Sequence, residues 1–439
     1  MSRLYPSTRP LYNILLSLLL GAILSLPLAG CSDKEDDAPA APVTPEDVPG
    51  RHRTVLIYMV ASNNLGTDGN NLRNIAMMEK WAGEHSLNDC NVILYHMRYA
   101  DNVISTTRVA TLERLTREGF VTVRRYEVNP SVIATDPEVM AEVMAEVRGT
   151  FPAESYGLVM WSHGDPWREG SFSTMGSRHW GADGIGTPGS QTYWSISLPP
   201  MGEVLTQTGP WEFIYFDSCY GANIETAYEL RNATPLVIGS STEVVSWGMP
   251  YDQTLTYMTA TEFDAEALAQ CTFDYYATFD SPNFDSATNR MARSCTMSVT
   301  RTDRLEAVAQ AARSVWEGGA RFNYATDRPI QPFMPSNASP NTLSFDMADT
   351  YAHLTGAAPE ALTEFQAALE RAVTYHANTP YMWQGASYEL PINTYCGLGT
   401  YIYPENPTPT ASRPDPYYGY SRLKWYTDVM SHATAEPLR

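Results

Sequence analysis

The chain has 439 residues, of which 44% are hydrophobic, 11% aromatic and only 18% charged. This composition excludes a wholly disordered protein, because the chain can bury a sizeable core, and the length suffices for two or three structural units. The formal net charge of −20 argues against nucleic acid as a partner, since Lys and Arg make phosphate contacts, and fits a cationic substrate better.

The N-terminal residues carry the pattern of an export signal. Arg3 and Arg9 precede an apolar run over 11–28, which ends in Leu-Ala-Gly before Cys31. A charged start, an apolar stretch and small residues before a cut site are typical of a secretory signal, although the run is also nearly long enough to span a membrane. Leu-Ala-Gly-Cys resembles the lipobox of bacterial lipoproteins. That resemblance favours a lipoprotein signal peptide over 1–31, with Cys31 as the lipidated N-terminus.

An acidic, Pro-rich segment follows at 32–50. It begins with Ser-Asp-Lys-Glu-Asp-Asp and holds four prolines, so we expect an extended, flexible linker. The acidic cluster resembles the surface-export signal of some Gram-negative lipoproteins, and a plain solvated linker is the alternative. The sequence therefore predicts a protein anchored by lipid at the outer membrane or cell surface, with the leaflet left open.

Five cysteines remain once Cys31 is assigned to lipidation. Because five is an odd number, at least one thiol in an oxidising compartment stays free or pairs between chains. No two of these cysteines stand a few residues apart, so their spacing does not indicate a zinc site. The five are Cys90, Cys219, Cys271, Cys295 and Cys396.

Short apolar runs rich in branched and aromatic residues alternate with helical patterns in the first half of the chain. Strands that are apolar on both faces belong in buried, mostly parallel sheets, and strands separated by helices form βαβ units. The sequence therefore predicts an α/β/α sandwich with a mostly parallel central sheet. The expected strands are 54–60, 91–97, 156–162, 212–218 and 235–239, and the expected helices cover 72–82, 139–147 and 224–230.

The second half of the chain predicts a mixed α/β region. We expect a first domain over 51–258 and a C-terminal region over 259–439 that packs on it. The stretch 320–345 is rich in Pro, Asn and Ser and predicts a loop. Helical patterns cover 260–280, 303–318 and 359–378, and strands are expected at 386–391 and 397–404.

Reactive side chains follow two of the predicted strands. One run ends at Ser162 and leads into His163-Gly164, and another ends at Ser218 and leads into Cys219. Ligands bind outside the carboxyl ends of parallel strands, so we expect these side chains to face one cleft. An imidazole can take the proton of a thiol, and the helix expected after Cys219 should lower the pKa of the thiol further. The amides of Gly164 and Cys219 could then stabilise a developing oxyanion.

Five separated motifs point to one family. They are YMVASNNL (58–65), WSHG (161–164), FDSC (216–219), ETAYEL (225–230) and CGLGTYIYP (396–404). In this order they resemble the clostripain family of cysteine endopeptidases, and the resemblance covers most of 51–439. It implies a caspase-like catalytic domain over 51–258, a catalytic His163 and Cys219, and no metal in the chemical step. Family analogy leaves a Ca²⁺ requirement open, although no Asp or Glu constellation here has ligand spacing.

The chain departs from the family pattern at two places. Tyr220 and Gly221 replace the Leu-Met pair expected after the nucleophile, and the loop over 164–198 is unusually Gly-rich. Arg168 and Arg178 lie in that loop, where an exposed cut would be tolerated. Because family members are often processed between their two catalytic residues, we hypothesise self-cleavage at one of these arginines.

Asp217 stands two residues before Cys219, so on an extended strand both side chains project from the same face. The resemblance implies that this Asp lies in the pocket for the residue that precedes the scissile bond, where a charge-assisted pair favours Arg or Lys. The alternative is an Asp that caps the following helix or fixes the loop. Glu243 and Asp252 follow the next strand and are further candidates for negative charge in the pocket.

Two other histidines are weaker candidates for the chemistry. His179 could be a second base, but its Gly-rich surroundings favour a surface residue. His96 ends a predicted strand, and a structural His with satisfied hydrogen bonds is the better interpretation.

The sequence as a whole predicts a lipid-anchored, extracytoplasmic cysteine endopeptidase that cleaves polypeptides after Arg or Lys through a thioester. A surface lipoprotein that binds peptide or glycan on the same fold without catalysis is the alternative. A second alternative is a hydrolase that cleaves after Asp or Asn.

Overall fold

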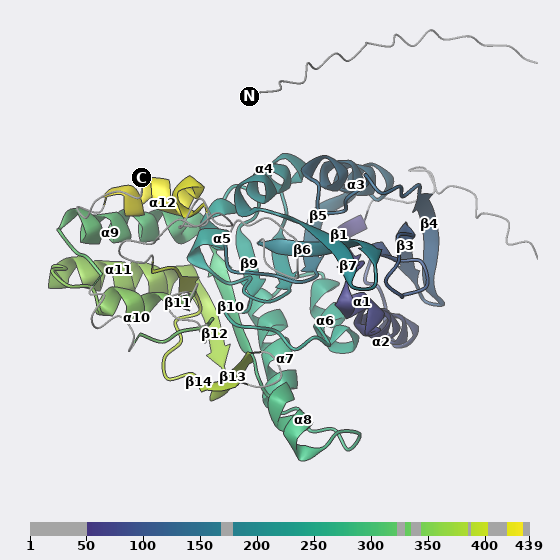
Figure 1. Cartoon of the computed structure of the whole chain (residues 1–439). Coiled ribbons are helices and arrows are strands. Elements are labelled where there is room, and N and C mark those ends of the chain that lie inside the picture. The colour runs from purple at the N-terminus through teal and green to yellow at the C-terminus, as the bar shows by residue number, and fades with distance from the viewer. Residues whose placement is uncertain are drawn as a thin grey trace, which may run out of the picture. The chain divides into compact units, whose positions relative to one another are not determined.

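Among the residues that the computed structural model describes, nine strands form the central sheet (Figure 1). Five of them run parallel in the middle, and antiparallel strands extend the sheet on both sides. The structure describes residues 51–167, 179–322, 330–334, 344–384, 388–402 and 419–432, which belong to one compact unit. In order along the sheet the strands are β12 (Val373–Asn378), β10 (Thr296–Arg301), β9 (Leu236–Gly239), β8 (Phe213–Asp217), β5 (Ala153–Trp161), β1 (Arg51–Ala61), β2 (Cys90–Tyr99), β3 (Arg108–Thr116) and β4 (Gly119–Tyr126).

Helices cover both faces of the sheet. In β1, Leu56 and Tyr58 face one hydrophobic core while Ile57 and Met59 face the other, as the two-residue period of a strand requires. The predicted α/β sandwich is thus confirmed, with α3 and α4 along one face and α2, α6 and α7 along the other (Figure 1). The first face holds α3 (Pro137–Thr150), α4 (Leu198–Thr208), α5 (Ile224–Glu229), α9 (Leu305–Glu317), α10 (Met347–Ala352), α11 (Pro359–Ala372) and α12 (Lys424–Asp428), and the second holds α2 (Asn70–Glu84), α6 (Tyr251–Met258) and α7 (Ala265–Ala277).

Short helices, strand pairs and 3-10 turns lie outside the main sheet and its covering helices. The short helix α1 (Asn64–Thr67) directly follows β1, and α8 (Ser286–Ala292) precedes β10. In the described part of the chain, three antiparallel pairs lie outside the main sheet. They are β6 (Trp180–Thr187) with β7 (Ser190–Ile196), β11 (Phe345–Asp346) with β15 (Gly399–Thr400), and β13 (Tyr381–Gln384) with β14 (Tyr388–Pro391). Turns of 3-10 helix cover Thr302–Arg304, Tyr420–Arg422 and Met430–His432.

The five strands predicted from apolar runs are all present. The structure differs from the prediction at a helix and at a loop. The helix expected over 359–378 ends at Ala372 and continues as β12, because Val373, Thr374 and Tyr375 favour a strand and the segment pairs with β10. The Gly-rich stretch 164–198 was expected to be a loop but contains the β6–β7 hairpin.

A buried ion pair joins segments that are far apart in the sequence. Asp183 in β6 is fully buried and lies 2.6 Å from the guanidinium of Arg108 in β3. The same carboxylate accepts hydrogen bonds from the Ser62 hydroxyl at 2.5 Å and the Ala134 backbone N–H at 2.7 Å. The pair therefore ties the end of β1 to the β6–β7 hairpin.

We expect Asp183→Ala to lower the free energy of unfolding by about 3 kcal/mol or more, because the variant leaves the Arg108 guanidinium buried without its charged partner. Chemical denaturation of the purified variant measures the effect. Asp280→Ala, which removes the exposed partner of Arg293, is the matched control and should cost less than about 1 kcal/mol. Equal losses in the two variants would contradict a structural role for the buried pair.

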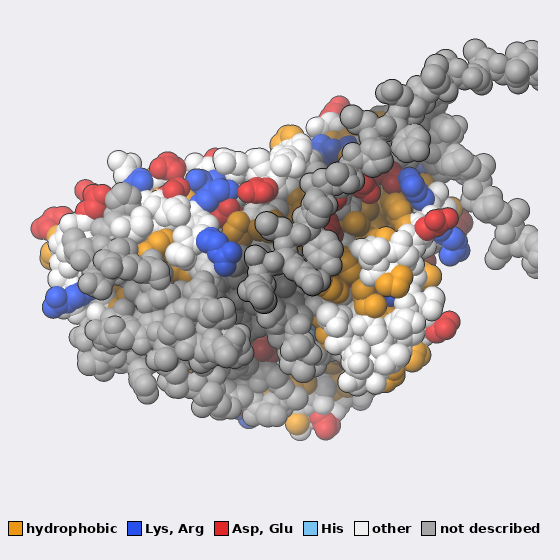
Figure 2. All heavy atoms as spheres, turned by 45° about the horizontal axis from the view of Figure 1, so that its top comes forward, with side chains coloured by type: hydrophobic (Ala, Val, Ile, Leu, Met, Phe, Trp, Pro, Cys, Tyr) orange, Lys and Arg blue, Asp and Glu red, His pale blue; other side chains and the backbone are white. Residues whose placement is uncertain are grey.

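The described residues include no helix with the length and apolar character that a membrane crossing needs. The apolar run over 11–28, Cys31 and the linker lie outside those residues. On the face that Figure 2 shows, acidic and basic side chains are interspersed among uncharged ones.

Candidate active site

The register between two neighbouring strands brings the backbones of His163 and Cys219 to the same edge of the sheet. Trp161 in β5 pairs with Asp217 in β8, and each reactive residue stands two positions further along its own chain. The two segments approach closely at Gly164, where a Cβ atom would lie only 2.2 Å from the carbonyl oxygen of Cys219. Glycine is therefore required at this position, and the two strand ends share one edge of the sheet.

The imidazole of His163 is partly exposed and makes one hydrogen bond among the described residues. Its Nε2 atom lies 2.7 Å from the amide oxygen of Asn64, which belongs to α1. Burial lowers the pKa of His163 to about 4, because a low-dielectric environment disfavours the charged ring. At neutral pH the ring is neutral and can accept a proton.

The thiol of Cys219 is held by the backbone of Val244. The Val244 N–H donates to Sγ at 3.3 Å, and the thiol donates to the Val244 carbonyl at 3.9 Å. Burial raises the pKa of Cys219 to about 12 with the help of the negative charge of Glu243, and the Val244 N–H acts in the opposite direction.

The expectation of a thiol pKa lowered by the following helix was therefore wrong. Helix α5 begins only at Ile224, and the N–H that reaches the sulfur belongs to Val244. At neutral pH the thiol is protonated, so a base must remove its proton as the sulfur reacts.

The backbone around the nucleophile leaves two amides available. Among the described residues, the N–H groups of Gly164 and Cys219 have no hydrogen-bond partner, whereas the next N–H, from Tyr220, binds the carbonyl of Thr242 at 3.1 Å. Tyr220 has a φ of 56°, in the left-handed region that non-glycine residues rarely adopt. The chain thus turns sharply directly after Cys219, and free amides at this turn suit an oxyanion site.

Asp217 is buried at the end of β8 and holds the segment that leads into α6. One carboxylate oxygen, Oδ2, accepts hydrogen bonds from the Met249 N–H at 3.1 Å and from the Tyr251 hydroxyl at 2.9 Å. The pKa of Asp217 is raised to about 6 by burial, against the effect of these two donors. The N-cap position of α5 is Asn223, so Asp217 does not cap that helix, but it does fix the loop.

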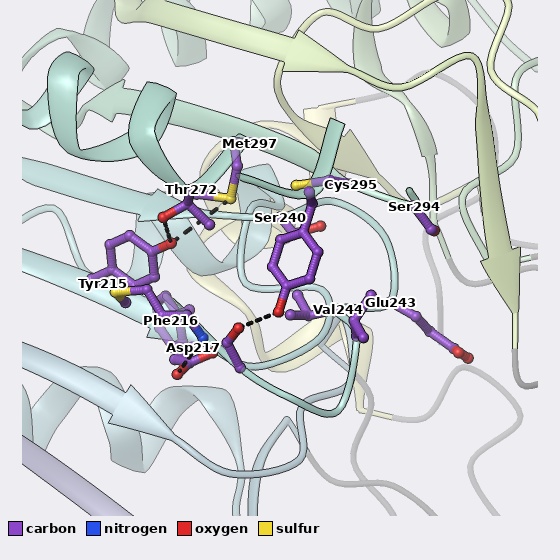
Figure 3. Close-up of a pocket in the computed structure, with 14 residues that line it drawn as sticks. Tyr215, Phe216, Asp217, Ser240, Glu243, Val244, Thr272, Ser294, Cys295 and Met297 are labelled. Atoms are coloured by element: carbon purple, nitrogen blue, oxygen red, sulfur yellow. Dashed lines mark hydrogen bonds between the residues drawn. The ribbon is translucent and has the colours of Figure 1, made fainter. Parts of the chain in front are cut away.

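A small cavity opens beside Asp217 (Figure 3). It is lined by Tyr276 from α7, by Cys295 and by Glu243, whose carboxylate points away from Asp217 in this view. Its volume is about 10 Å³, roughly the room that one water needs. The segment over 243–249 contributes five residues to the lining, and Gly248 in this segment has a φ of +71° with no space for a side chain beside Asp217.

The remaining sequence candidates fall in different places. Asp252 lies on α6, 3.5 Å from Lys80, and does not line the cavity. The expectation of a surface His179 was wrong, because its ring is buried and Nδ1 donates to the carbonyls of Asp165 and Pro166. His96 is a buried structural residue, as expected, with Nε2 at 2.9 Å from the Asn71 amide.

Three of the predicted site residues lie outside the part of the chain that the structure describes, and one prediction concerns a metal. Arg168 and Arg178 lie outside the described residues, as does Cys31. Within the described part of the chain, no group of three or more His, Cys, Asp or Glu side chains gathers as a metal site requires. A Ca²⁺ requirement therefore stays a prediction from family analogy alone.

Sequence reasoning missed Asn64 and Tyr251. A signal for Asn64 was present, because it follows the end of β1, and the rule that selected His163 and Cys219 applies equally there. Tyr251 lies far from Asp217 in the sequence, and no spacing pattern relates the two residues.

The chain was compared with family models, with curated proteins and with solved structures. The family model described as the clostripain family matches residues 57–355. Among curated proteins, none matches the chain.

Several solved structures share the fold. An inactive zymogen of a C11 protease from Parabacteroides distasonis is 24% identical with a TM-score of 0.68, over 87% of this chain and 99% of that one. A secreted C11 cysteine protease from Bacteroides thetaiotaomicron, iotapain, is 22% identical with a TM-score of 0.68. The match covers 87% of this chain and 100% of that one. A secreted C11 cysteine protease from the same organism, in complex with an irreversible peptide inhibitor, is 24% identical with a TM-score of 0.68. The match covers 86% of this chain and 98% of that one. These likenesses confirm the expected caspase-like fold.

Proposed function

Because the chain belongs to the clostripain family of cysteine endopeptidases, we propose that His163 and Cys219 are its catalytic dyad and that it cleaves polypeptides after Arg or Lys. The observation that carries this proposal is the register of β5 and β8, which sets both residues at equivalent positions beyond a paired Trp161 and Asp217. The close approach of Gly164 to Cys219 supports it further.

The proposed mechanism begins with a neutral thiol and a neutral imidazole. His163 takes the proton of Cys219 while the sulfur attacks the scissile carbonyl carbon, and the N–H groups of Gly164 and Cys219 bind the resulting oxyanion. The tetrahedral intermediate collapses to a thioester as His163 gives its proton to the leaving amine. His163 then takes a proton from a water that attacks the thioester, and the carboxylic acid product leaves with the thiol restored.

Substrate selection is assigned to Asp217. A cationic side chain in the cavity would pair with the carboxylate, and an apolar side chain would leave that charge buried and unpaired. The cavity of about 10 Å³ is too small for Arg or Lys, so its lining must move before a basic side chain can enter. We assign this movement to the segment over 243–249, which contributes five of the lining residues.

Reporter peptides test the proposal directly. On a panel that ends in Arg, Lys, Asp, Asn or Leu before the reporter group, kcat/KM should be at least about 10²-fold higher with Arg and Lys than with the other three. A thiol-directed peptide probe that carries Arg should label the parent protein and not Cys219→Ala. Absence of labelling and of turnover would favour a protein that binds peptide or glycan without catalysis, and turnover after Asp or Asn would reassign the specificity.

The raised pKa of Asp217 predicts a pH dependence that is specific to basic substrates. Below about pH 6 the carboxyl is protonated and cannot pair with a cation, so kcat/KM on an Arg reporter should rise with pH through about 6. His163 has a pKa of about 4 and stays neutral across this range. Profiles of kcat/KM from pH 4.5 to 8 on Arg and Leu reporters check this. The same inflection with both reporters would assign the titration to another group.

The domain boundaries and the anchor belong to the same proposal. A catalytic domain over 51–258 and a C-terminal region over 259–439 are part of this proposal, and the cavity, which draws residues from both, supports the packing of the second on the first. Lipidation of Cys31 and placement at the outer membrane or cell surface are supported by the lipobox-like sequence alone. Intact-mass analysis of protein extracted from membranes tests the anchor, and the masses of any fragments test cleavage at Arg168 or Arg178.

A further inference from the structure

A motif at the end of β1 has no role in the mechanism above. Ser62, Asn63 and Asn64 follow the strand, and β1 is the direct neighbour of β5, which leads to His163. Three adjacent parallel strands thus deliver Asn64, His163 and Cys219 to one edge of the sheet. The bond of 2.7 Å between the Asn64 amide oxygen and His163 Nε2 joins the first two.

The chain around Asn64 is firmly held. The side chain of Asn63 is buried, and its amide donates to the carbonyls of Val60 at 2.9 Å and Ala182 at 2.8 Å. At Gly66 a Cβ atom would lie 1.9 Å from the carbonyl oxygen of Ala61, so only glycine allows this tight turn. These contacts fix the direction in which α1 presents Asn64.

We propose that Asn64 is a positioning residue that orients the ring of His163 and fixes its tautomer. The amide oxygen accepts the proton on Nε2, so Nδ1 carries the lone pair that receives the thiol proton. Asn64 is uncharged, and among the described residues no carboxylate bonds to this ring, so the imidazolium gains little stabilisation and the ring remains a neutral base. This inference rests on the proposed dyad of His163 and Cys219.

The test compares Asn64→Ala and Asn64→Asp with the parent protein. We expect Asn64→Ala to lower kcat by about 10- to 100-fold with KM little changed, because the ring loses its orientation while the pocket at Asp217 is untouched. Asn64→Asp should restore activity to within about fivefold of the parent, since a carboxylate accepts the same proton. It should also shift the acidic limb of the pH profile of kcat upward, because the negative charge raises the pKa of the ring.

The tautomer itself is readable by ¹⁵N NMR of protein labelled at histidine, with His163 assigned by its absence in His163→Ala. The parent should show a protonated Nε2 and an unprotonated Nδ1, and Asn64→Ala should show a mixture. Asn71→Ala is the matched control, because it removes another Asn–His hydrogen bond, to His96 in β2. It should leave kcat and the His163 tautomer unchanged, and thermal unfolding reports the stability of each variant.

The outcomes separate this inference from the proposed function. If His163→Ala and Cys219→Ala keep parent activity, the proposed dyad is wrong. If these two variants are inactive while Asn64→Ala keeps parent kcat and the parent tautomer, the dyad stands and the role of Asn64 is wrong. An Asn64→Asp variant as impaired as Asn64→Ala also overturns it, because the amide would then act as a donor to Nε2 rather than as an acceptor.

Discussion

The Cys219→Ala variant should lose at least about 10⁴-fold in kcat/KM on an Arg reporter, because the sulfur forms the covalent intermediate and no neighbouring group replaces it. His163→Ala should lose a similar factor, since the thiol of the free enzyme is protonated at neutral pH and requires a base. If the two residues act as one unit, the double variant will be no less active than either single variant. Steady-state kinetics on the three variants measures this.

Cys271→Ala provides the matched control. Cys271 is a partly buried free thiol on α7 that does not line the cavity beside Asp217. Its replacement should leave kcat/KM within about twofold of the parent. A Cys219→Ala variant that keeps a tenth of the parent activity would place the nucleophile elsewhere, and a double variant with multiplied losses would show that the two residues act independently.

The strand ends were predictable because local patterns determine them. An apolar run of five to seven residues predicts a buried strand, and the residue after it lies at the carboxyl edge of the parallel sheet where ligands bind. His163, Cys219 and Asp217 all follow from this one rule, since β5 and β8 proved to be neighbours in register. The antiparallel strand β12 was missed because it continues from α11 without a break in the sequence pattern.

The environment of the thiol was not predictable in the same way. The pKa of a buried group depends on how much water reaches it and on charges that other segments bring close. Val244 contacts Cys219 from 25 positions away in sequence, and Glu243 adds a negative charge beside it. No periodicity or spacing relates these residues, so the sequence suggested a lowered thiol pKa where the structure has a raised one.

One segment contacts both the thiol and Asp217. The Val244 N–H donates to the sulfur of Cys219, and Met249, a few residues later, donates its N–H to Asp217. The stretch over 243–249 also contributes five residues to the lining of the cavity. We therefore expect a substrate that reaches both Cys219 and Asp217 to shift this one segment.

Selectivity for basic residues should depend on Asp217 above all. We expect Asp217→Asn to lower kcat/KM on Arg and Lys reporters by about 10²- to 10³-fold, because a charge-assisted pair is lost and the cation is left in a buried neutral site. The Asn side chain has nearly the same shape, and its oxygen can still accept from the Met249 N–H and the Tyr251 hydroxyl. The loop should therefore stay in place.

Two comparisons make this prediction specific to charge recognition. Asp252→Asn removes one negative charge from α6, next to Lys80 and outside the cavity, and should change kcat/KM on the Arg reporter by less than about twofold. Asp217→Asn should also lose the rise in kcat/KM through pH 6, because the titrating group is gone. If it lowers turnover of Leu and Arg reporters by the same factor, Asp217 holds the active site together without selecting the substrate, and the basic preference must come from another carboxylate.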